Sequence, residues 1–125
     1  MYHKSDLEKF LFLAISILST AVAQVLIKYG TLQTGGFVFS KFFETFPKVI
    51  FNPFILLGLF VLSIGFLFWV QTLSKLDLSL AYPAVASAYV IVTILSAVIF
   101  SEAISPLRWL ALTIIIFGVI LLSRS

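Results

Sequence analysis

Four polar side chains recur at every fourth position of the first long apolar run, residues 10–29: Ser16, Thr20, Gln24 and Lys28. On a helix, a step of four residues turns about 400°, so these side chains form one slowly drifting stripe that ends in a cation. Polar groups are costly in hydrocarbon, so we expect the stripe to face protein, water or a ligand rather than lipid. Such a stripe could hydrogen-bond a polar cargo, and Lys28 could neutralise an anion.

Structural explanations of the same stripe stay open. Gln24 could simply hydrogen-bond a neighbouring helix, a contact worth about 0.6 kcal/mol on average in a membrane. Lys28 lies near the helix end, where a lysine commonly extends its ammonium group to the interface at little cost. In the functional interpretation, Lys28 meets a lipid phosphate at headgroup depth instead.

Three more candidate substrate-binding residues come from later apolar runs. Tyr82 stands beside Pro83, and an irregular helix at a proline can line a cavity. Ser87 adds a hydroxyl group five residues further on. Trp69 completes the set, although it also fits an aromatic anchor at the membrane interface.

The composition makes a membrane the setting for these residues. Of 125 residues, 62% are hydrophobic and only 10% are charged, which is too little polar surface for a soluble globule of this size. The chain has no cysteine and a single histidine, His3, so we expect no metal site and no imidazole catalysis. It also lacks paired carboxylates and a glycine-rich phosphate loop, and we therefore predict neither an enzyme nor a cofactor. The net charge of +3 is too small and scattered to indicate nucleic acid.

The apolar segments that position the stripe predict an all-α integral membrane fold. Each is long enough, at about 1.5 Å per residue, to cross a hydrocarbon core of about 30 Å. We expect one transmembrane domain over residues 1–125, with spans at about residues 10–29, 53–73, 79–100 and 106–122.

The links between these spans carry further signals. Glycines and threonines at residues 31–36 are expected to end the first helix. Residues 38–50 place phenylalanines at helical spacing with charged residues between them, which predicts a short interfacial helix, bent at Pro47. A loop whose phenylalanines touch lipid is the alternative. The short link at residues 75–77 makes the second and third spans antiparallel neighbours.

Two pairs of small residues predict close helix contacts. Gly58 and Gly65 are seven residues apart, so they share a face and let another backbone approach. Ala111 and Gly118 have the same spacing, and we assign them to a contact between subunits. The Lys and Arg residues divide evenly between the two faces of the membrane. If Lys28 is left out as a site residue, the positive-inside rule weakly favours an orientation with both termini in the cytoplasm.

Several short motifs together resemble the drug/metabolite transporter superfamily (EamA-like), in particular its compact four-helix members. The resemblance covers almost the whole chain and rests on Ala23-Gln24 followed by Lys28, on Ala81-Tyr82-Pro83, and on the segment 100–106. The small multidrug resistance members carry a membrane-embedded Glu eight residues before a Lys. Thr20 holds that position here, so their proton-coupling carboxylate is missing.

The chain is also similar to the small subunits that flip undecaprenyl-phosphate-linked aminoarabinose across the bacterial inner membrane, which lack that Glu as well. This resemblance implies a multi-pass inner-membrane subunit that passes a polyprenyl-phosphate-linked sugar, or a related anionic lipid, between leaflets. It implies a homodimer or a heterodimer with a similar subunit, with a cavity between first helices. We expect Thr20, Gln24, Lys28, Tyr82 and Ser87 to line it. The alternatives are a small multidrug or metabolite exporter and a non-transporting accessory or scaffold subunit.

Overall fold

The computed structural model describes residues 4–125, which form helices joined by short links. In chain order these are α1 (Lys4–Thr34), the 3-10 turn η1 (Phe39–Lys41), α2 (Phe42–Ile50), α3 (Pro53–Leu73), α4 (Leu78–Ala84), α5 (Ser87–Ile99) and α6 (Pro106–Ser123). Within this described part, four segments are long and apolar enough to cross a membrane: Leu7–Thr34, Pro53–Leu73, Leu78–Ile99 and Pro106–Ser123. The predicted all-α fold with four spans is confirmed.

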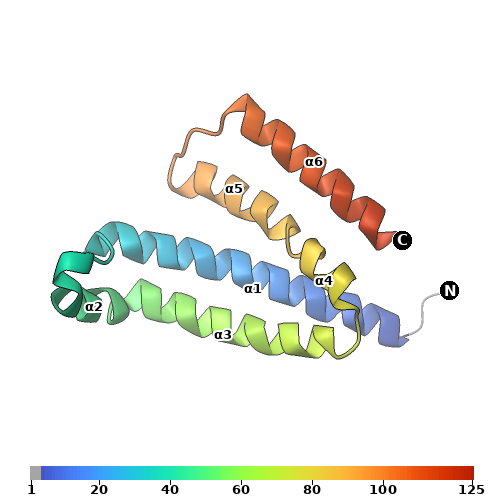
Figure 1. Cartoon of the computed structure of the whole chain (residues 1–125), viewed down its shortest axis with the longest axis horizontal. Coiled ribbons are helices and arrows are strands. Elements are labelled where there is room, and N and C mark those ends of the chain that lie inside the picture. Colours follow the sequence, from blue (N-terminus) through green and yellow to red (C-terminus); the bar gives the residue numbers. More distant parts are fainter. Residues whose placement is uncertain (1–3) are drawn as a thin grey trace.

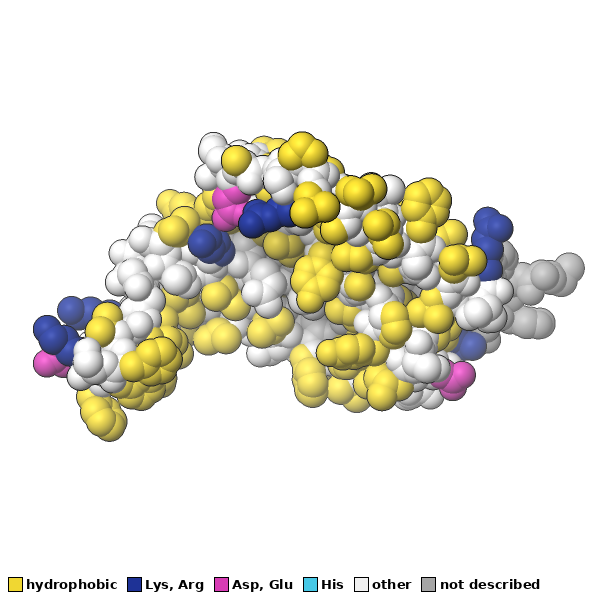
Figure 2. Space-filling model, turned by 45° about the horizontal axis from the view of Figure 1, so that its top comes forward, with side chains coloured by type: hydrophobic (Ala, Val, Ile, Leu, Met, Phe, Trp, Pro, Cys, Tyr) yellow, Lys and Arg dark blue, Asp and Glu magenta, His cyan; other side chains and the backbone are white. Residues whose placement is uncertain are grey.

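The helices form a layered, antiparallel arrangement (Figure 1). α1 and α3 lie side by side, α5 packs on α1, and α6 packs on α4 and α5 at the outside. The first turn of α1 and the last turn of α6 lie at the same end of the molecule (Figure 1). Figure 2 shows charged side chains at the two ends of this face and a further charged group at its upper left, while hydrophobic side chains cover most of the rest.

Two glycines of α3 let this helix approach α1 closely. A Cβ atom at Gly58 would lie 2.7 Å from Cγ1 of Ile27 and 3.1 Å from the carbonyl oxygen of Ala23. A Cβ atom at Gly65 would lie 2.8 Å from Cβ of Ser19. Any larger side chain would therefore separate the helices, and the close contact predicted for this glycine pair is confirmed.

The first helix is longer than the sequence predicted. The break expected to begin at Thr31 begins after Thr34, because the threonine side chains support the last turn. Thr31 Oγ1 donates to the carbonyl of Ile27 at 2.8 Å, and Thr34 Oγ1 donates to that of Gly30 at 3.1 Å. The helix ends only at Gly35 and Gly36, whose φ angles of +82° and +76° favour glycine.

The short helix predicted between the first two spans is present as η1 and α2, and α2 continues through Pro47. Phe37, Phe42 and Phe46 form an aromatic cluster with ring centroids 5.3–5.8 Å apart. Phe43 is 90% exposed, and such an apolar ring on an amphipathic helix suits the lipid interface.

Asn52 fixes the start of α3 against the end of α1. Its Oδ1 accepts hydrogen bonds from the backbone N–H groups of Phe54 and Ile55, and Pro53 occupies the first helical position. Its Nδ2 donates to Oε1 of Gln33 on α1 at 3.1 Å. Together with the glycine contacts, this cap sets the position of α1 relative to α3.

Candidate functional site

The third span is interrupted about two turns after its start at Leu78, where we had expected one helix over residues 79–100. Pro83 has no N–H group, so the helical hydrogen bond to the carbonyl of Ser79 cannot form. The chain then tightens, with the N–H of Ala86 donating to Pro83 O and that of Ala88 to Val85 O, both at 2.9 Å. As a result α4 ends at Ala84 and α5 begins at Ser87.

This interruption faces two adjoining pockets between α1, α3 and the α4–α5 segment. We call the larger, of about 480 Å³, the Gln24 pocket; Gln24 and Thr20 of α1 line it together with Tyr82, Tyr89 and the Pro83 turn. We call the smaller, of about 340 Å³, the Trp69 pocket; its wall includes Ser16, Leu62, Phe66 and Trp69. The pockets share Thr20, Tyr82 and Val85, so they form one groove.

The structure brings together four of the six predicted substrate-binding residues: Thr20, Gln24, Trp69 and Tyr82. Lys28 lines neither pocket. It lies one helical turn beyond Gln24 on α1, about 6 Å along the axis, and it is exposed. Ser87 is also outside both linings, and its hydroxyl group donates to the carbonyl of Ala84 at 2.8 Å. His3, considered for metal or acid–base chemistry in the sequence, lies outside the described residues.

The groove has mostly apolar walls with a few polar side chains, and its linings include no acid from the described part of the chain. Gln24 is exposed, and its amide makes no hydrogen bond with any residue of the described chain. Thr20 Oγ1 donates to the carbonyl of Ser16 at 2.9 Å, so its oxygen remains free to accept. Neither lining contains Asp or Glu from the described part of the sequence. The groove can therefore pair with neutral or anionic polar groups, while it offers no carboxylate to a cation or proton.

Two aromatic rings form the boundary between the pockets. The ring of Trp69 on α3 meets that of Tyr82 on α4 edge to face, with centroids 6.5 Å apart. Tyr82 is 69% exposed and lines both pockets. The sequence did not single out Tyr89, although it lies seven residues after Tyr82 and thus on the same helical face, a signal that could have identified it.

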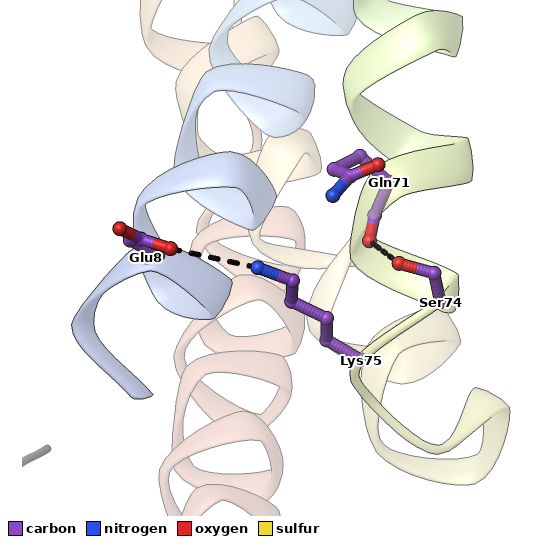
Figure 3. Close-up of polar contacts among 4 residues, drawn as sticks. All are labelled: Glu8, Gln71, Ser74 and Lys75. Carbon is purple, nitrogen blue, oxygen red and sulfur yellow. Dashed lines mark hydrogen bonds and ion pairs between the residues drawn. The ribbon is translucent and has the colours of Figure 1, made fainter. Parts of the chain in front are cut away.

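The end of the groove nearer Ser16 leads toward a short link between α3 and α4. In Figure 3, Lys75 reaches from this link to Glu8 on α1, with Nζ 3.5 Å from Oε2. The same ammonium group lies 5.5 Å from the centroid of the Phe12 ring. Ser74 Oγ donates to the carbonyl of Gln71 at 2.6 Å, which closes the last turn of α3 (Figure 3). These contacts tie the link to α1, although an exposed ion pair adds less than about 1 kcal/mol.

The predicted subunit-contact residues lie on an open face of α6. Ala111 and Gly118 are both exposed, and a Cβ atom at Gly118 would meet nothing within 4 Å. Only 6% of the most apolar window of α6 is buried, compared with 22% for α1. The pair therefore makes no close helix contact inside the described chain, and its assigned role stays a prediction.

Comparison with known proteins gives consistent matches over nearly the whole chain. Residues 9–124 match the EamA-like transporter family. The chain is 29% identical over 118 residues to the Probable 4-amino-4-deoxy-L-arabinose-phosphoundecaprenol flippase subunit ArnE of Pseudomonas savastanoi pv. phaseolicola, which covers 92% of this chain and 96% of that protein. Proteins of the same name from Proteus mirabilis and Pseudomonas syringae pv. syringae are 30% and 31% identical, over 91% and 90% of this chain and 95% and 97% of their own length. No solved structure matches.

Proposed function

Since the chain belongs to the EamA-like transporter family, we propose that it is a flippase subunit that moves a polyprenyl-phosphate-linked sugar, or a related anionic lipid, between membrane leaflets. The relatives named above are flippase subunits for such a lipid. As a transporter subunit, the protein makes and breaks no covalent bond in its cargo. We place it in the inner membrane as one four-helix transmembrane domain.

The observation that carries this proposal is the Gln24 pocket. It is an uncharged recess within the bilayer-spanning part that holds the amide of Gln24 and a few hydroxyl groups, and it lies one turn away from the exposed cation Lys28. A phosphate or a sugar is costly in hydrocarbon, so a lipid headgroup needs such a path, while most of the lipid chain can stay in the bilayer. Lys28 attracts the phosphate at headgroup depth, and the Gln24 amide then pairs with the headgroup as it passes.

The same pocket argues against a proton-coupled exporter of cationic drugs. Thr20 occupies the place of the acid found in the small multidrug resistance transporters, and its hydroxyl group is turned to the Ser16 carbonyl. Neither lining contains a carboxylate or an imidazole group from the described part of the chain that could carry a coupled proton. We therefore prefer flipping of an anionic lipid down its gradient.

We further propose that the subunit works in a homodimer or with a similar subunit. The relatives are themselves named as subunits, which fits an assembly of more than one chain. The open face of α6 with Ala111 and Gly118 is our candidate contact, since small residues let helices approach closely in lipid.

Binding of undecaprenyl phosphate to the purified protein tests the proposed function. We expect this lipid to raise the thermal unfolding temperature, and Lys28→Ala to weaken its binding about five- to tenfold, because one lysine near a membrane surface contributes about 1 kcal/mol toward an anionic lipid. Lys28→Arg should keep most of the affinity. Lys48→Ala, which removes an exposed lysine on α2, is the matched control and should have a smaller effect.

Other outcomes would contradict the proposal. Stabilisation by tetraphenylphosphonium without any effect of the lipid would favour the drug exporter. No response to either ligand would favour the accessory or scaffold subunit.

A further inference from the structure

The walls of both pockets are mostly apolar, but the Trp69 pocket lacks the amide of Gln24 that the neighbouring pocket has. Apolar and aromatic side chains of α3, chiefly Leu62, Phe66 and Trp69, supply much of its wall. Of its hydroxyl groups, that of Thr20 already donates to its own helix, and Ser16 is only 4% exposed. A sugar placed there would therefore leave most of its hydroxyl groups without partners, which disfavours a headgroup in this pocket.

The two pockets follow one another along α1 without a separating wall. Ser16 lines the Trp69 pocket, Gln24 lines the Gln24 pocket, and Thr20 between them lines both. The groove thus has its amide, Gln24, at one end and the aromatic side chains Phe66 and Trp69 at the other, about two helical turns apart along α1. A ligand that fills it would place its polar end at the amide and an apolar part against the aromatic wall. The junction between the phosphate and the isoprenoid chain of a polyprenyl phosphate provides both parts.

We propose that the Trp69 pocket holds the first isoprene units of the polyprenyl phosphate while its headgroup lies in the Gln24 pocket. This inference rests on the proposed function and adds a site for the lipid chain. The Trp69–Tyr82 ring pair lies at the boundary between the two pockets. Tyr82 lines both pockets, so its side chain would contact the headgroup as well as the first isoprene units. The protein then recognises the lipid by its chain as well as by its headgroup.

The two tryptophans of the chain allow a direct test. Trp109→Phe leaves Trp69 as the only tryptophan, inside the groove, and Trp69→Phe leaves Trp109, which is 44% exposed near the start of α6 and lines neither pocket. The probe is an undecaprenyl phosphate analogue with a nitroxide quencher on its first isoprene unit. We expect saturable quenching of Trp69, reversed by unlabelled undecaprenyl phosphate, and only non-saturable background quenching of Trp109.

Failure of this inference can be told apart from failure of the proposed function. If undecaprenyl phosphate raises the unfolding temperature of the Trp109→Phe variant but the probe leaves Trp69 unquenched, the chain lies elsewhere and the inference is overturned. Equal reversal of the quenching by undecaprenol and by the phosphate would also overturn it, because the headgroup would then contribute nothing in the Gln24 pocket. If neither ligand nor probe binds, the proposed function fails first.

Discussion

At the scale of single residues, the amide of Gln24 is the most informative group in the molecule. An amide inside a membrane needs hydrogen-bond partners, and in the part of the chain that the structure describes Gln24 has none. Gln33 differs, since its side-chain oxygen accepts from Asn52 and joins α1 to α3. Gln33 therefore joins two helices of the same chain, whereas the amide of Gln24 is available to a ligand or to another subunit.

This contrast predicts opposite outcomes for two leucine substitutions. Gln24→Leu should leave the unfolding temperature unchanged or raise it, because it removes an unpaired polar group, and should weaken undecaprenyl phosphate binding about fivefold, the worth of one hydrogen bond. Gln33→Leu should lower stability by about 1 kcal/mol and leave binding intact. Thermal unfolding and lipid titration of both variants check this. A loss of stability in Gln24→Leu without a loss of binding would show that Gln24 is structural.

At the scale of helices, the close pairing of α1 with α3 is the rigid part of the fold. Gly58→Val should destabilise the protein by about 1–3 kcal/mol, because the new side chain meets the carbonyl of Ala23, a backbone atom that cannot move aside. Gly118→Val is the matched control, since space is open around that glycine. Denaturant titration in detergent measures both. Equal stability of the two variants would mean that α1 and α3 pack more loosely than described.

The helices could be predicted from the sequence more accurately than the site. Apolar length and the Asn52-Pro53 cap are local signals, and they placed the spans to within a few residues, apart from the additional turns of α1. The proline pointed to a kink in the third span, but hydropathy does not reveal that the helix stops at Ala84 and resumes at Ser87.

The site depends on contacts between distant parts of the chain. Trp69 meets Tyr82 only because α3 and α4 turn back on each other. Lys28 continues the spacing of four, but it lies about 6 Å beyond Gln24 along α1 and does not line the pocket. The spacing was visible in the sequence, but the length of the pocket was not. The cavity expected between the first helices of two subunits stays a prediction, whereas the groove of the single chain lies between α1, α3 and α4–α5.

At the scale of the whole molecule, the buried share of each span decreases from the first span to the fourth. Most of the surface of α6 therefore faces outward from the bundle. If Ala111 and Gly118 form the subunit contact, Gly118→Val should weaken association without lowering the stability of the single chain, because a valine there obstructs only an approaching helix. Cross-linking in membranes and the mass of the detergent-solubilised complex measure association. Unchanged association would place the interface on another face.

The link between α3 and α4 has a further consequence for movement. Residues 74–77 are the only covalent connection between the α1–α3 pair and the helices that follow, and Lys75 fastens this link to Glu8. If the two halves rock about these residues as a hinge, displacement grows with distance from the pivot, so the groove widens most at the end where Lys28 lies.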